Sequence, residues 1–339
     1  MKTYTSEEAT NMSVKSYGQA LSEALSEEME RDPTVFVMGE DVALIGGLFG
    51  ATAGLLDKFG ESRVIDTPIS ETMIVGAGVG AAITGRRPFV DLQFADFVGV
   101  AMDEVVNKAA KWRYMHGGLY KVPLVIAGAI GAMGGAGAEH SQCPEAWLLH
   151  TPGLKVALPA TPADAKGLLK VAIRDDNPVV FLTHKALIAT QGEVPDGDHL
   201  VPFGQARIAR EGADVTIVTY SHMVHKALEA AEKAAEEGIS CEVIDLRTVA
   251  PLDMDTVLAS VEKTGRLLIA HEAPVTGGVG AEISARVAEQ ALYSLEAPIK
   301  RVCGQDVPIP QSIRLEAMCI PQVKDILAGI RELGRGGTA

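Results

Sequence analysis

The chain has 339 residues, of which 47% are hydrophobic and 22% are charged, and its formal net charge is −14. This length and hydrophobic content predict a packed globular protein with room for two domains, and they exclude an intrinsically disordered chain. The negative charge, without any run of Lys or Arg, excludes nucleic acid as an expected partner, and no apolar stretch reaches membrane-spanning length.

The cysteine pattern bears on the cellular compartment. The four cysteines, Cys143, Cys241, Cys303 and Cys319, form no C-x-x-C pair. This spacing predicts neither a disulfide framework nor a zinc site, and it favours a reducing compartment. Residues 1–13 are polar and partly acidic, unlike a signal peptide or a transit peptide. We therefore expect a cytoplasmic protein with a short N-terminal tail.

The first half of the chain alternates between helical and strand patterns. Apolar residues recur at helical spacing from Val14 to Leu25, with Ser13 as the expected N-cap, and Asp32-Pro33 ends this helix. Further helices are expected at 51–59, 71–84, 98–112 and 162–175, and short strands at 35–38, 63–66, 89–93, 123–127 and 179–182. This alternation predicts a parallel sheet covered by helices on both faces.

The composition changes after this unit. Residues 189–203 contain the polar, turn-rich stretch from Gln191 to Asp198, which is typical of a linker between domains. Strands are then expected at 215–220, 241–245 and 267–270, and helices at 224–237 and 255–263. The sequence therefore predicts a first α/β domain at 14–188, a linker at 189–203 and a second α/β domain at 204–339.

Two glycine-rich stretches are candidates for chemistry. Gly76, Gly78 and Gly80 resemble a dinucleotide-binding loop, but they fall inside a predicted helix instead of directly after a strand, so we favour close helix packing. The second stretch, 128–137, follows a strand and leads to the sequence Glu139-His-Ser-Gln142. Its histidine, His140, is either an acid–base or substrate-contacting residue or a histidine bonded to nearby backbone.

Further candidates arise on local grounds. Glu71 follows a strand and begins a helix, which is where parallel sheets bind ligands, although a glutamate there also stabilises a helix N-terminus. His222 and His225 lie three residues apart, and without further ligands at matching spacing they predict a solvated helix face instead of a metal site. The pair His271-Glu272 follows a strand and is either the edge of a site or an ordinary hydrogen-bonded pair.

Eight short motifs, taken in order, resemble those of one known family: Met38 to Asp41, Arg63 to Glu71, Asp91 to Phe97, Glu139 to Gln142, Pro152 to Val156, Asp164 to Leu168, Ile173 to Pro178 and Ile320 to Asp325. The family comprises the β subunits of the first component of 2-oxoacid dehydrogenase complexes, namely pyruvate, branched-chain 2-oxoacid and acetoin dehydrogenases. The resemblance runs from about Val14 to about Leu333. It implies an α/β domain that binds the pyrimidine of thiamine diphosphate, a transketolase C-terminal domain, an α2β2 heterotetramer and a lipoyl acyltransferase core as partner.

The resemblance also implies roles for individual residues. Glu71 corresponds to the glutamate that hydrogen-bonds the aminopyrimidine of thiamine diphosphate and favours the imino tautomer, whose nitrogen removes the thiazolium proton. Phe97 corresponds to the aromatic residue that packs against the aminopyrimidine, and Gln93 is a further cofactor-binding position. His140 corresponds to a channel histidine that helps to transfer the acyl group to lipoamide.

The metals that the resemblance implies lie at two places. The positions of a structural potassium ion, bound largely through backbone carbonyls, correspond to Leu124, Ala172, Asp175 and Asn177. The end of the preceding helix leaves carbonyls unpaired, but water or side chains are the alternative partners. The Gly-Asp-Gly motif that holds magnesium and the diphosphate does not occur in this chain, and in the resembled family it lies on the α subunit. The chain is therefore expected to carry half of a cofactor site.

Departures from the family leave the substrate open. Thr183 stands where many relatives have an acidic residue, Thr72-Met73 replaces smaller or aromatic residues, and Gln93 matches the branched-chain type better than the pyruvate type. The leading prediction is a dehydrogenase β subunit that cleaves pyruvate, a branched-chain 2-oxo acid or acetoin. The alternative is the β-like half of a two-subunit, transketolase-like ketol transferase. The glycine placement disfavours a nicotinamide dehydrogenase, and Glu71 disfavours a non-catalytic scaffold.

Overall fold

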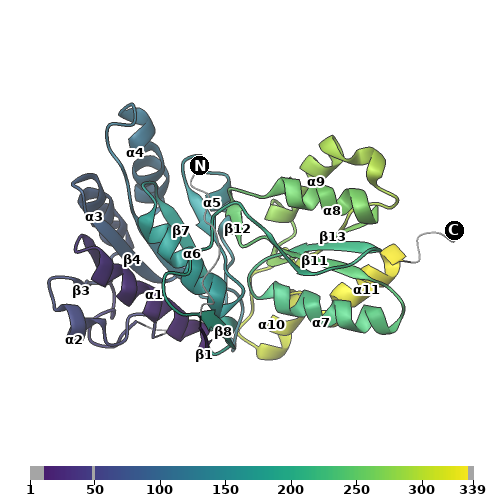
Figure 1. Ribbon diagram of the computed structural model, residues 1–339, viewed down its shortest axis with the longest axis horizontal. Helices are drawn as coiled ribbons and strands as arrows, with labels where there is room; N and C mark the ends of the chain where they lie inside the picture. The colour runs from purple at the N-terminus through teal and green to yellow at the C-terminus, as the bar shows by residue number, and fades with distance from the viewer. Residues whose placement is uncertain (1–10, 48–49, 335–339) are drawn as a thin grey trace.

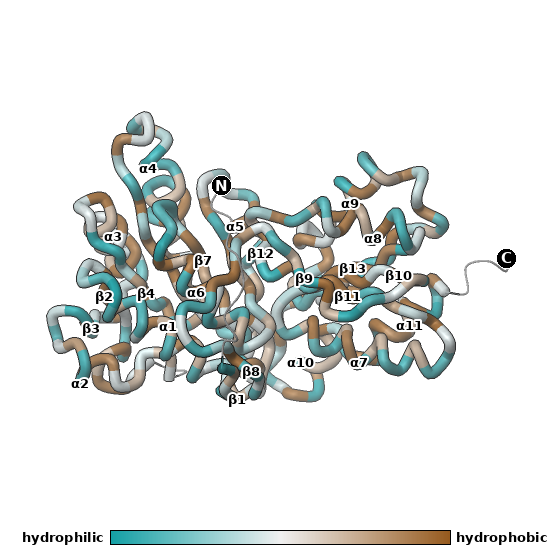
Figure 2. Tube along the Cα trace, viewed as in Figure 1, coloured by the Kyte–Doolittle hydropathy of each residue, from teal (hydrophilic) through white to brown (hydrophobic). Residues whose placement is uncertain are grey.

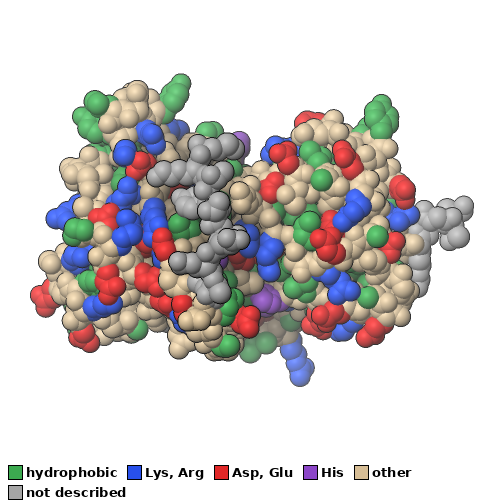
Figure 3. Space-filling view, in the orientation of Figure 1, with side chains coloured by type: hydrophobic (Ala, Val, Ile, Leu, Met, Phe, Trp, Pro, Cys, Tyr) green, Lys and Arg blue, Asp and Glu red, His purple; other side chains and the backbone are tan. Residues whose placement is uncertain are grey.

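The computed structural model describes residues 11–47 and 50–334, which form two α/β lobes side by side (Figure 1). Most of the predicted N-terminal tail therefore lies outside the described residues. Figure 2 shows helices whose colour alternates between hydrophobic and hydrophilic residues, as expected where one face of a helix is buried. Figure 3 shows acidic and basic side chains mixed over both lobes on this face. In the described part of the chain, every helix is too short or too polar to span a bilayer.

The first lobe is built on a seven-stranded sheet with the order β12-β6-β7-β5-β4-β2-β3. Neighbouring strands are parallel except for β12, which pairs antiparallel with β6. The strands are β2 (Val35–Gly39), β3 (Val64–Asp66), β4 (Arg87–Phe94), β5 (Val125–Ile130), β6 (Lys155–Ala157), β7 (Val179–His184) and β12 (Thr248–Ala250). The predicted parallel sheet is confirmed, with one strand supplied from far beyond the predicted linker.

Helices cover both faces of this sheet, as predicted. One face carries α1 (Tyr17–Arg31), α2 (Leu55–Phe59) and α6 (Pro162–Arg174). The other face carries α3 (Glu71–Ile83), the 3-10 helix η1 (Ala95–Gly99), the π-helix η2 (Asp103–Ala109), α4 (Ala110–Met115) and α5 (Glu145–Leu149). The side chain of Thr161 caps α6, because its Oγ1 accepts a hydrogen bond from the Asp164 N–H at 3.1 Å.

Two predictions in this lobe are wrong in detail. Met12–Ser16 forms strand β1 instead of the start of a helix, and the N-cap of α1 is Ser16. β1 pairs antiparallel with β8 (Gln191–Pro195), which lies inside the predicted linker. Local periodicity could not indicate this ribbon, because its two strands are far apart in the sequence. The single helix expected at 98–112 consists of η1, η2 and α4 in succession.

The second lobe is a five-stranded sheet with the order β14-β13-β10-β11-β9, in which only β9 is antiparallel to its neighbour. Its strands are β9 (Arg207–Arg210), β10 (Val215–Thr219), β11 (Cys241–Asp245), β13 (Leu267–Pro274) and β14 (Lys300–Gly304). The helices are α7 (Met223–Glu236) and α11 (Val323–Gly334) on one face, α8 (Met254–Thr264) and α9 (Val279–Gln290) on the other, and η4 (Leu292–Ser294) and α10 (Ile313–Cys319) in connections. The 3-10 helix η3 (Lys185–Leu187) follows β7 and belongs to the first lobe. The strands and helices predicted for this half are confirmed.

One hydrophobic core runs from the first lobe into the second. It joins Leu148 and Leu154, beneath the first sheet, to Ile244 and Leu246 of the second lobe. β12 crosses between the lobes, and the neighbouring Arg247 forms a 2.7 Å ion pair with Asp164 of α6. Because shared apolar burial is the dominant favourable term in packing, the two lobes form one folded body.

Gly78 offers a test of the packing interpretation of the glycine-rich helix. A Cβ at Gly78 would lie 2.9 Å from Val90 Cγ1 and 3.0 Å from Leu124 Cδ1, whereas a Cβ at Gly80 meets no described atom within 4 Å. We expect Gly78→Ala to lower the free energy of unfolding by about 1–3 kcal/mol through overpacking, and Gly80→Ala to raise it by up to about 1 kcal/mol. Chemical denaturation measures both changes, and equal effects would contradict the packing role.

Candidate active site

Strands β3, β4 and β5 of the first sheet run parallel and end at one edge, with β2 between β3 and β4, and each of the three is followed by a residue singled out from the sequence. Glu71 begins α3 after β3, Gln93 and Phe97 lie at the end of β4 and in η1, and His140 lies in the loop after β5. Open parallel sheets bind ligands at the carboxyl ends of their strands. The structure therefore brings all four predicted residues to the edge where a ligand is expected.

Glu40, which follows β2, lies close to both Glu71 and Gln93. The Gln93 Nε2 donates a hydrogen bond to the Glu40 carbonyl oxygen at 3.3 Å. Burial raises the pKa of the Glu40 carboxyl, and the charges of Asp41 and Glu71 raise it further. Asp41 and Gln93 have φ angles of 58° and 59°, a conformation that is uncommon for non-glycine residues and is enriched at functional sites. Several carboxylates so close together favour a ligand that offers hydrogen-bond donors.

An aromatic cluster of Phe94, Phe97 and His140 forms the next part of the edge. The His140 ring centroid lies 4.7 Å from that of Phe94 and 5.4 Å from that of Phe97, and both contacts are edge to face. The two phenylalanine rings are themselves 6.0 Å apart. Such contacts are attractive and directional, so they fix the imidazole in orientation. The predicted cofactor residue Phe97 and the predicted catalytic residue His140 are thus direct neighbours.

The loop that carries His140 is held from the first lobe by two charged residues. Lys185, in η3, donates a hydrogen bond from Nζ to the carbonyl oxygen of His140. Asp96, in η1, accepts a hydrogen bond at its Oδ1 from the Gln142 N–H at 2.9 Å. Both charged residues are buried. The loop is therefore fixed on both sides of the histidine, although it is rich in glycine.

The second lobe holds the same loop through two buried glutamates. Glu272, in β13, accepts hydrogen bonds from the Ala132 N–H and, at 3.0 Å, from His184 Nε2. Glu316, in α10, accepts a hydrogen bond at its Oε2 from the Gly135 N–H at 2.9 Å. Burial alone would raise the pKa of Glu272, but the His184 charge and the hydrogen bonds from His184 and Ala132 hold that pKa well below its usual range. Of the two alternatives left open for His271-Glu272, Glu272 lies at the edge of the site, and both residues are part of β13 instead of following a strand. No sequence pattern indicated the role of Glu316.

A further buried pair, also missed from the sequence, lies close to this loop. The Tyr220 hydroxyl donates a hydrogen bond to Glu145 Oε1 at 2.7 Å. Burial raises the pKa of Glu145 to about 7, and the hydrogen bond from Tyr220 opposes that rise. Both residues also border a small cavity with Glu272. The contact between the lobes therefore holds two buried carboxyl groups, Glu272 and Glu145. Of these, Glu145 is the one whose pKa lies close to neutral pH.

The predicted solvated face of His222 and His225 is wrong. The His222 ring stacks on that of His184 with centroids 4.7 Å apart, and His225 Nε2 is hydrogen-bonded to the Ala160 carbonyl oxygen at 2.8 Å. These histidines lie at the carboxyl end of β10, where the second lobe packs against the first. The helical spacing was correctly recognised, but it could not show that this end of the helix faces another lobe.

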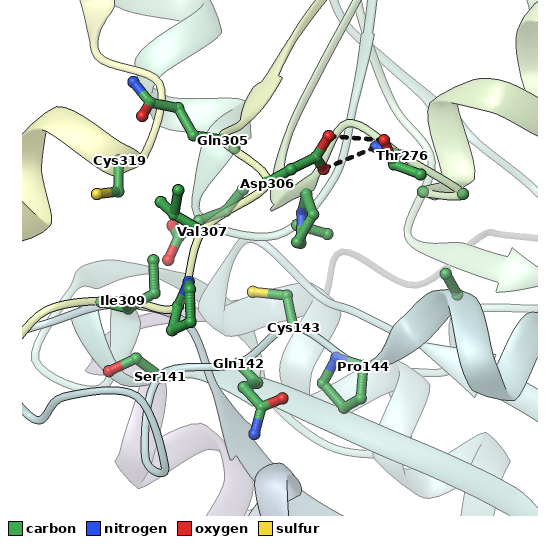
Figure 4. Close-up of a pocket in the computed structure, with 18 of the residues that line it drawn as sticks. Ser141, Gln142, Cys143, Pro144, Thr276, Gln305, Asp306, Val307, Ile309 and Cys319 are labelled. Atoms are coloured by element: carbon green, nitrogen blue, oxygen red, sulfur yellow. Dashed lines mark hydrogen bonds between the residues drawn. The ribbon is translucent and has the colours of Figure 1, made fainter.

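A cavity of about 570 Å³ opens between the lobes beside the His140 loop. Figure 4 shows residues of the first lobe on one wall and residues of the second on the other. The labelled wall residues are Ser141, Gln142, Cys143 and Pro144 on the first lobe and Thr276, Gln305, Asp306, Val307, Ile309 and Cys319 on the second. Thr276 donates a hydrogen bond to Asp306 across 2.6 Å. The loop therefore borders open space on its second-lobe side.

The predicted potassium-binding residues gather near the C-terminus of α6: Leu124, Ala172, Asp175 and Asn177. Cationic side chains already engage this group. Arg87 donates to the Asp175 carbonyl oxygen at 2.9 Å, Lys155 pairs with the Asp175 carboxylate, and Arg113 donates to Asn177 Oδ1 at 2.7 Å. Side chains thus satisfy several oxygens of the expected site, and a bound potassium ion stays a prediction.

For divalent metals, the described ranges 11–47 and 50–334 hold no cluster of three or more His, Cys, Asp or Glu side chains arranged around a common point.

Comparison with known families matches two parts of the chain. Residues 13–191 match the family model described as "Transketolase, pyrimidine binding domain", and residues 204–326 match "Transketolase, C-terminal domain". A solved structure described as a split gene transketolase in an inactive β4 tetramer has a TM-score of 0.77 at 26% identity, covering 94% of this chain and 97% of that one. Fold and site thus define a two-domain protein of the transketolase type.

Individual relatives of the chain belong to a narrower family within this class. The chain is 49% identical to the β subunit of acetoin:2,6-dichlorophenolindophenol oxidoreductase from Cupriavidus necator, over 94% of this chain and 97% of that protein. It is 45% identical to the 2-oxoisovalerate dehydrogenase β subunit of Bacillus subtilis, over 95% and 99%. It is 50% identical to a mitochondrial pyruvate dehydrogenase β subunit of Arabidopsis thaliana, over 91% and 86%. The chain belongs to the family of transketolase-type dehydrogenase β subunits.

The raised pKa of Glu145 predicts how the free energy of unfolding changes with pH. Its folded pKa of about 7 exceeds the usual value of 4.5, so the folded chain binds this proton more tightly than the unfolded chain does. The stability that this group contributes is complete below the unfolded pKa and is lost as the pH rises through the folded pKa. From about pH 5 to about pH 8, Glu145→Gln should gain about 3 kcal/mol of unfolding free energy relative to the wild type.

Denaturation of both proteins at each pH measures this difference. Glu289→Gln, at an exposed position of α9, is the matched control and should follow the wild type. A constant difference between Glu145→Gln and the wild type across the pH range would show that Glu145 does not titrate in it.

Proposed function

We propose that the chain is the β subunit of a thiamine-diphosphate-dependent dehydrogenase that cleaves a 2-oxo acid or acetoin and transfers the acyl group to a lipoyl-lysine. The observation that carries the proposal is the meeting of Glu71, Gln93, Phe97 and His140 at one sheet edge. The names of the relatives support it, since they are β subunits of enzymes for acetoin, 2-oxoisovalerate and pyruvate.

The residues at this edge fit the aminopyrimidine half of the cofactor. The Glu71 carboxylate is suited to hold a proton shared with a ring nitrogen, the Phe97 ring offers an apolar surface for stacking, and the Gln93 amide adds a polar contact. When bound, thiamine diphosphate supplies the carbon nucleophile and the electron sink for cleavage of the substrate. The chain's own contribution is to orient that cofactor and to exclude water on the phenylalanine side.

His140 is suited to a later proton transfer. Imidazole is the side chain that exchanges protons most readily near neutral pH, and this ring is held by Phe94 and Phe97 at the same edge. In the proposed role the S–S bond of the lipoyl group breaks as one sulfur takes the acyl group, and His140 delivers a proton to the other sulfur as it leaves. The loop around His140 positions this group but does not itself react.

The surroundings of Glu71 support a partner that completes the site. Ile69, Met73 and Val100 are 72%, 39% and 58% exposed, although all three are apolar, and Thr72 Oγ1 donates to the Val100 carbonyl oxygen at 2.9 Å. Exposed apolar groups around a functional residue are typical of a surface that another chain covers. We assign this face to an α subunit that brings the diphosphate motif and magnesium, in an α2β2 heterotetramer that serves a lipoyl acyltransferase core.

The compartment proposed is the cytoplasm. The four cysteines are free and Cys241 is buried, as expected for a protein that folds under reducing conditions.

Two positions where the sequence departs from parts of the family border a small internal cavity. Thr183 and Gln93 line this cavity of about 30 Å³ together with Asp91. Burial raises the pKa of Asp91 to about 6. A threonine in place of an acidic residue removes one charge from this confined space, which has room for about one water and not for a substrate group.

The proposed function is tested by co-expressing the chain with its α subunit and measuring reduction of an artificial electron acceptor. With magnesium and thiamine diphosphate present, we expect turnover with one of pyruvate, a branched-chain 2-oxo acid or acetoin, and none with either subunit alone. A stable, cofactor-binding complex that is inactive with all three would contradict the proposal. Turnover of ketose phosphates by that complex would instead establish the transketolase-like alternative.

Glu71→Gln tests the proton-holding role directly. The amide preserves the shape of the side chain but cannot take the proton, so turnover should fall by about 100-fold or more while the α–β complex assembles normally. Acceptor reduction measures the first effect, and size-exclusion chromatography the second. Glu61→Gln, an exposed position before β3, should leave both unchanged. Near-normal turnover of Glu71→Gln would remove this residue from the mechanism.

A further inference from the structure

Lys185 is a charged residue in a buried position. It lies just after β7 and is only 7% exposed. Its ammonium group donates a hydrogen bond to the carbonyl oxygen of His140 and lies 5.6 Å from the centroid of the Phe94 ring. Burying a lysine is unfavourable unless its charge is compensated and its donors are used. Lys185 therefore needs compensating negative charge and hydrogen-bond acceptors around it.

Three buried carboxylates act on the charge of Lys185. Burial lowers the pKa of Lys185, whereas the charges of Asp96, Glu272 and Glu316 raise it. Their side chains belong to residues that are 9%, 7% and 5% exposed. Each of these carboxylates also accepts a hydrogen bond from a backbone N–H of the loop 131–142. The lysine thus balances the same negative charges that hold the loop from both lobes.

The contacts of Lys185 converge on one side chain. The carbonyl oxygen that it binds belongs to His140 itself, and the ring beneath its ammonium group is that of Phe94. The Phe94 ring in turn touches the His140 imidazole, with centroids 4.7 Å apart. Removing the ammonium group would leave the carbonyl without this donor and would take one counter-charge away from three carboxylates, of which Glu272 keeps its contact with His184. The predicted response is a shift of the loop that takes the imidazole away from Phe94.

We propose that Lys185 is a positioning residue that holds His140 in the orientation needed for acyl transfer to the lipoyl group. This inference rests on the proposed function, because it assigns a task to the histidine of that site. It concerns the later half-reaction alone. Formation of the acyl group at the cofactor depends on Glu71, whose helix follows a different strand.

The experiment uses the intact α–β complex and two assays. Acceptor reduction reports the steps up to substrate cleavage, and reductive acylation of a lipoyl domain reports the complete transfer. Lys185→Met should slow acylation by about 10- to 100-fold, through a lower kcat, and change acceptor reduction by about twofold at most. His140→Ala should show the same selective loss, and the double variant Lys185→Met/His140→Ala should be no slower than His140→Ala alone.

Two further variants separate positioning from general stability. Lys170, in α6, is the matched control because it is also buried, at 2% exposure, and is paired with Glu27 at 2.7 Å and Asp198 at 2.8 Å. Lys170→Met should change both assays to the same extent. If Lys185→Met fails to assemble, Glu316→Gln serves instead, since it keeps the shape of the side chain and removes one of the three balancing charges. It should produce the same selective loss in weaker form.

The outcomes distinguish this inference from the function on which it rests. A selective loss in Lys185→Met that is not additive with His140→Ala supports the inference. Equal losses in both assays, or an additive double variant, overturn it while leaving the proposed function standing. Equal losses in His140→Ala itself overturn the role of that histidine and this inference together. A wild-type complex that turns over none of the three substrates overturns the proposed function.

Discussion

The Glu272 carboxylate joins the two lobes at the point where the site is formed. It comes from the second lobe, yet its hydrogen bonds are made to Ala132 and His184 of the first. A buried carboxylate is stable only where donors and positive charge surround it, so separation of the lobes would leave both Glu272 and the loop unsatisfied. The His140 loop therefore has its observed shape only while the lobes are packed together, and the geometry of the sheet edge depends on this contact.

The second sheet contacts the first lobe at the position where open α/β sheets usually bind ligands. β11 lies on one side of β10, and β13, which follows later in the chain, lies on the other side. Open α/β sheets bind ligands at such a switch point. Here the carboxyl ends of β10 and β13 supply Tyr220, His222 and Glu272, which meet Glu145 and His184 of the first lobe. The place where a related sheet would hold a small molecule holds a polar surface of the neighbouring lobe instead.

The parts that were predictable from sequence are those with local signals. The strand at 35–38 and the helix beginning at Thr161-Pro162 follow from apolar runs and capping chemistry, and the site residues follow from their places after strands together with the family resemblance. Strands β1 and β12 were missed, because their partners are far away in the sequence: Ser13 pairs with Val194, and Thr248 with Ala157. The buried roles of Lys185 and Glu316 were missed because single charged residues in polar surroundings carry no periodic pattern.

The antiparallel strand β12 has a consequence for how this architecture can be recombined. It forms an edge of the first sheet but lies in the sequence between strands of the second. Residues 14–188 alone would present β6 as an open edge, and an unpaired strand edge invites association with other chains. An exchange of second lobes between relatives would also exchange this edge strand. The two lobes are therefore not independent modules, and a hybrid must match the β6–β12 pairing as well as the surfaces that meet between the lobes.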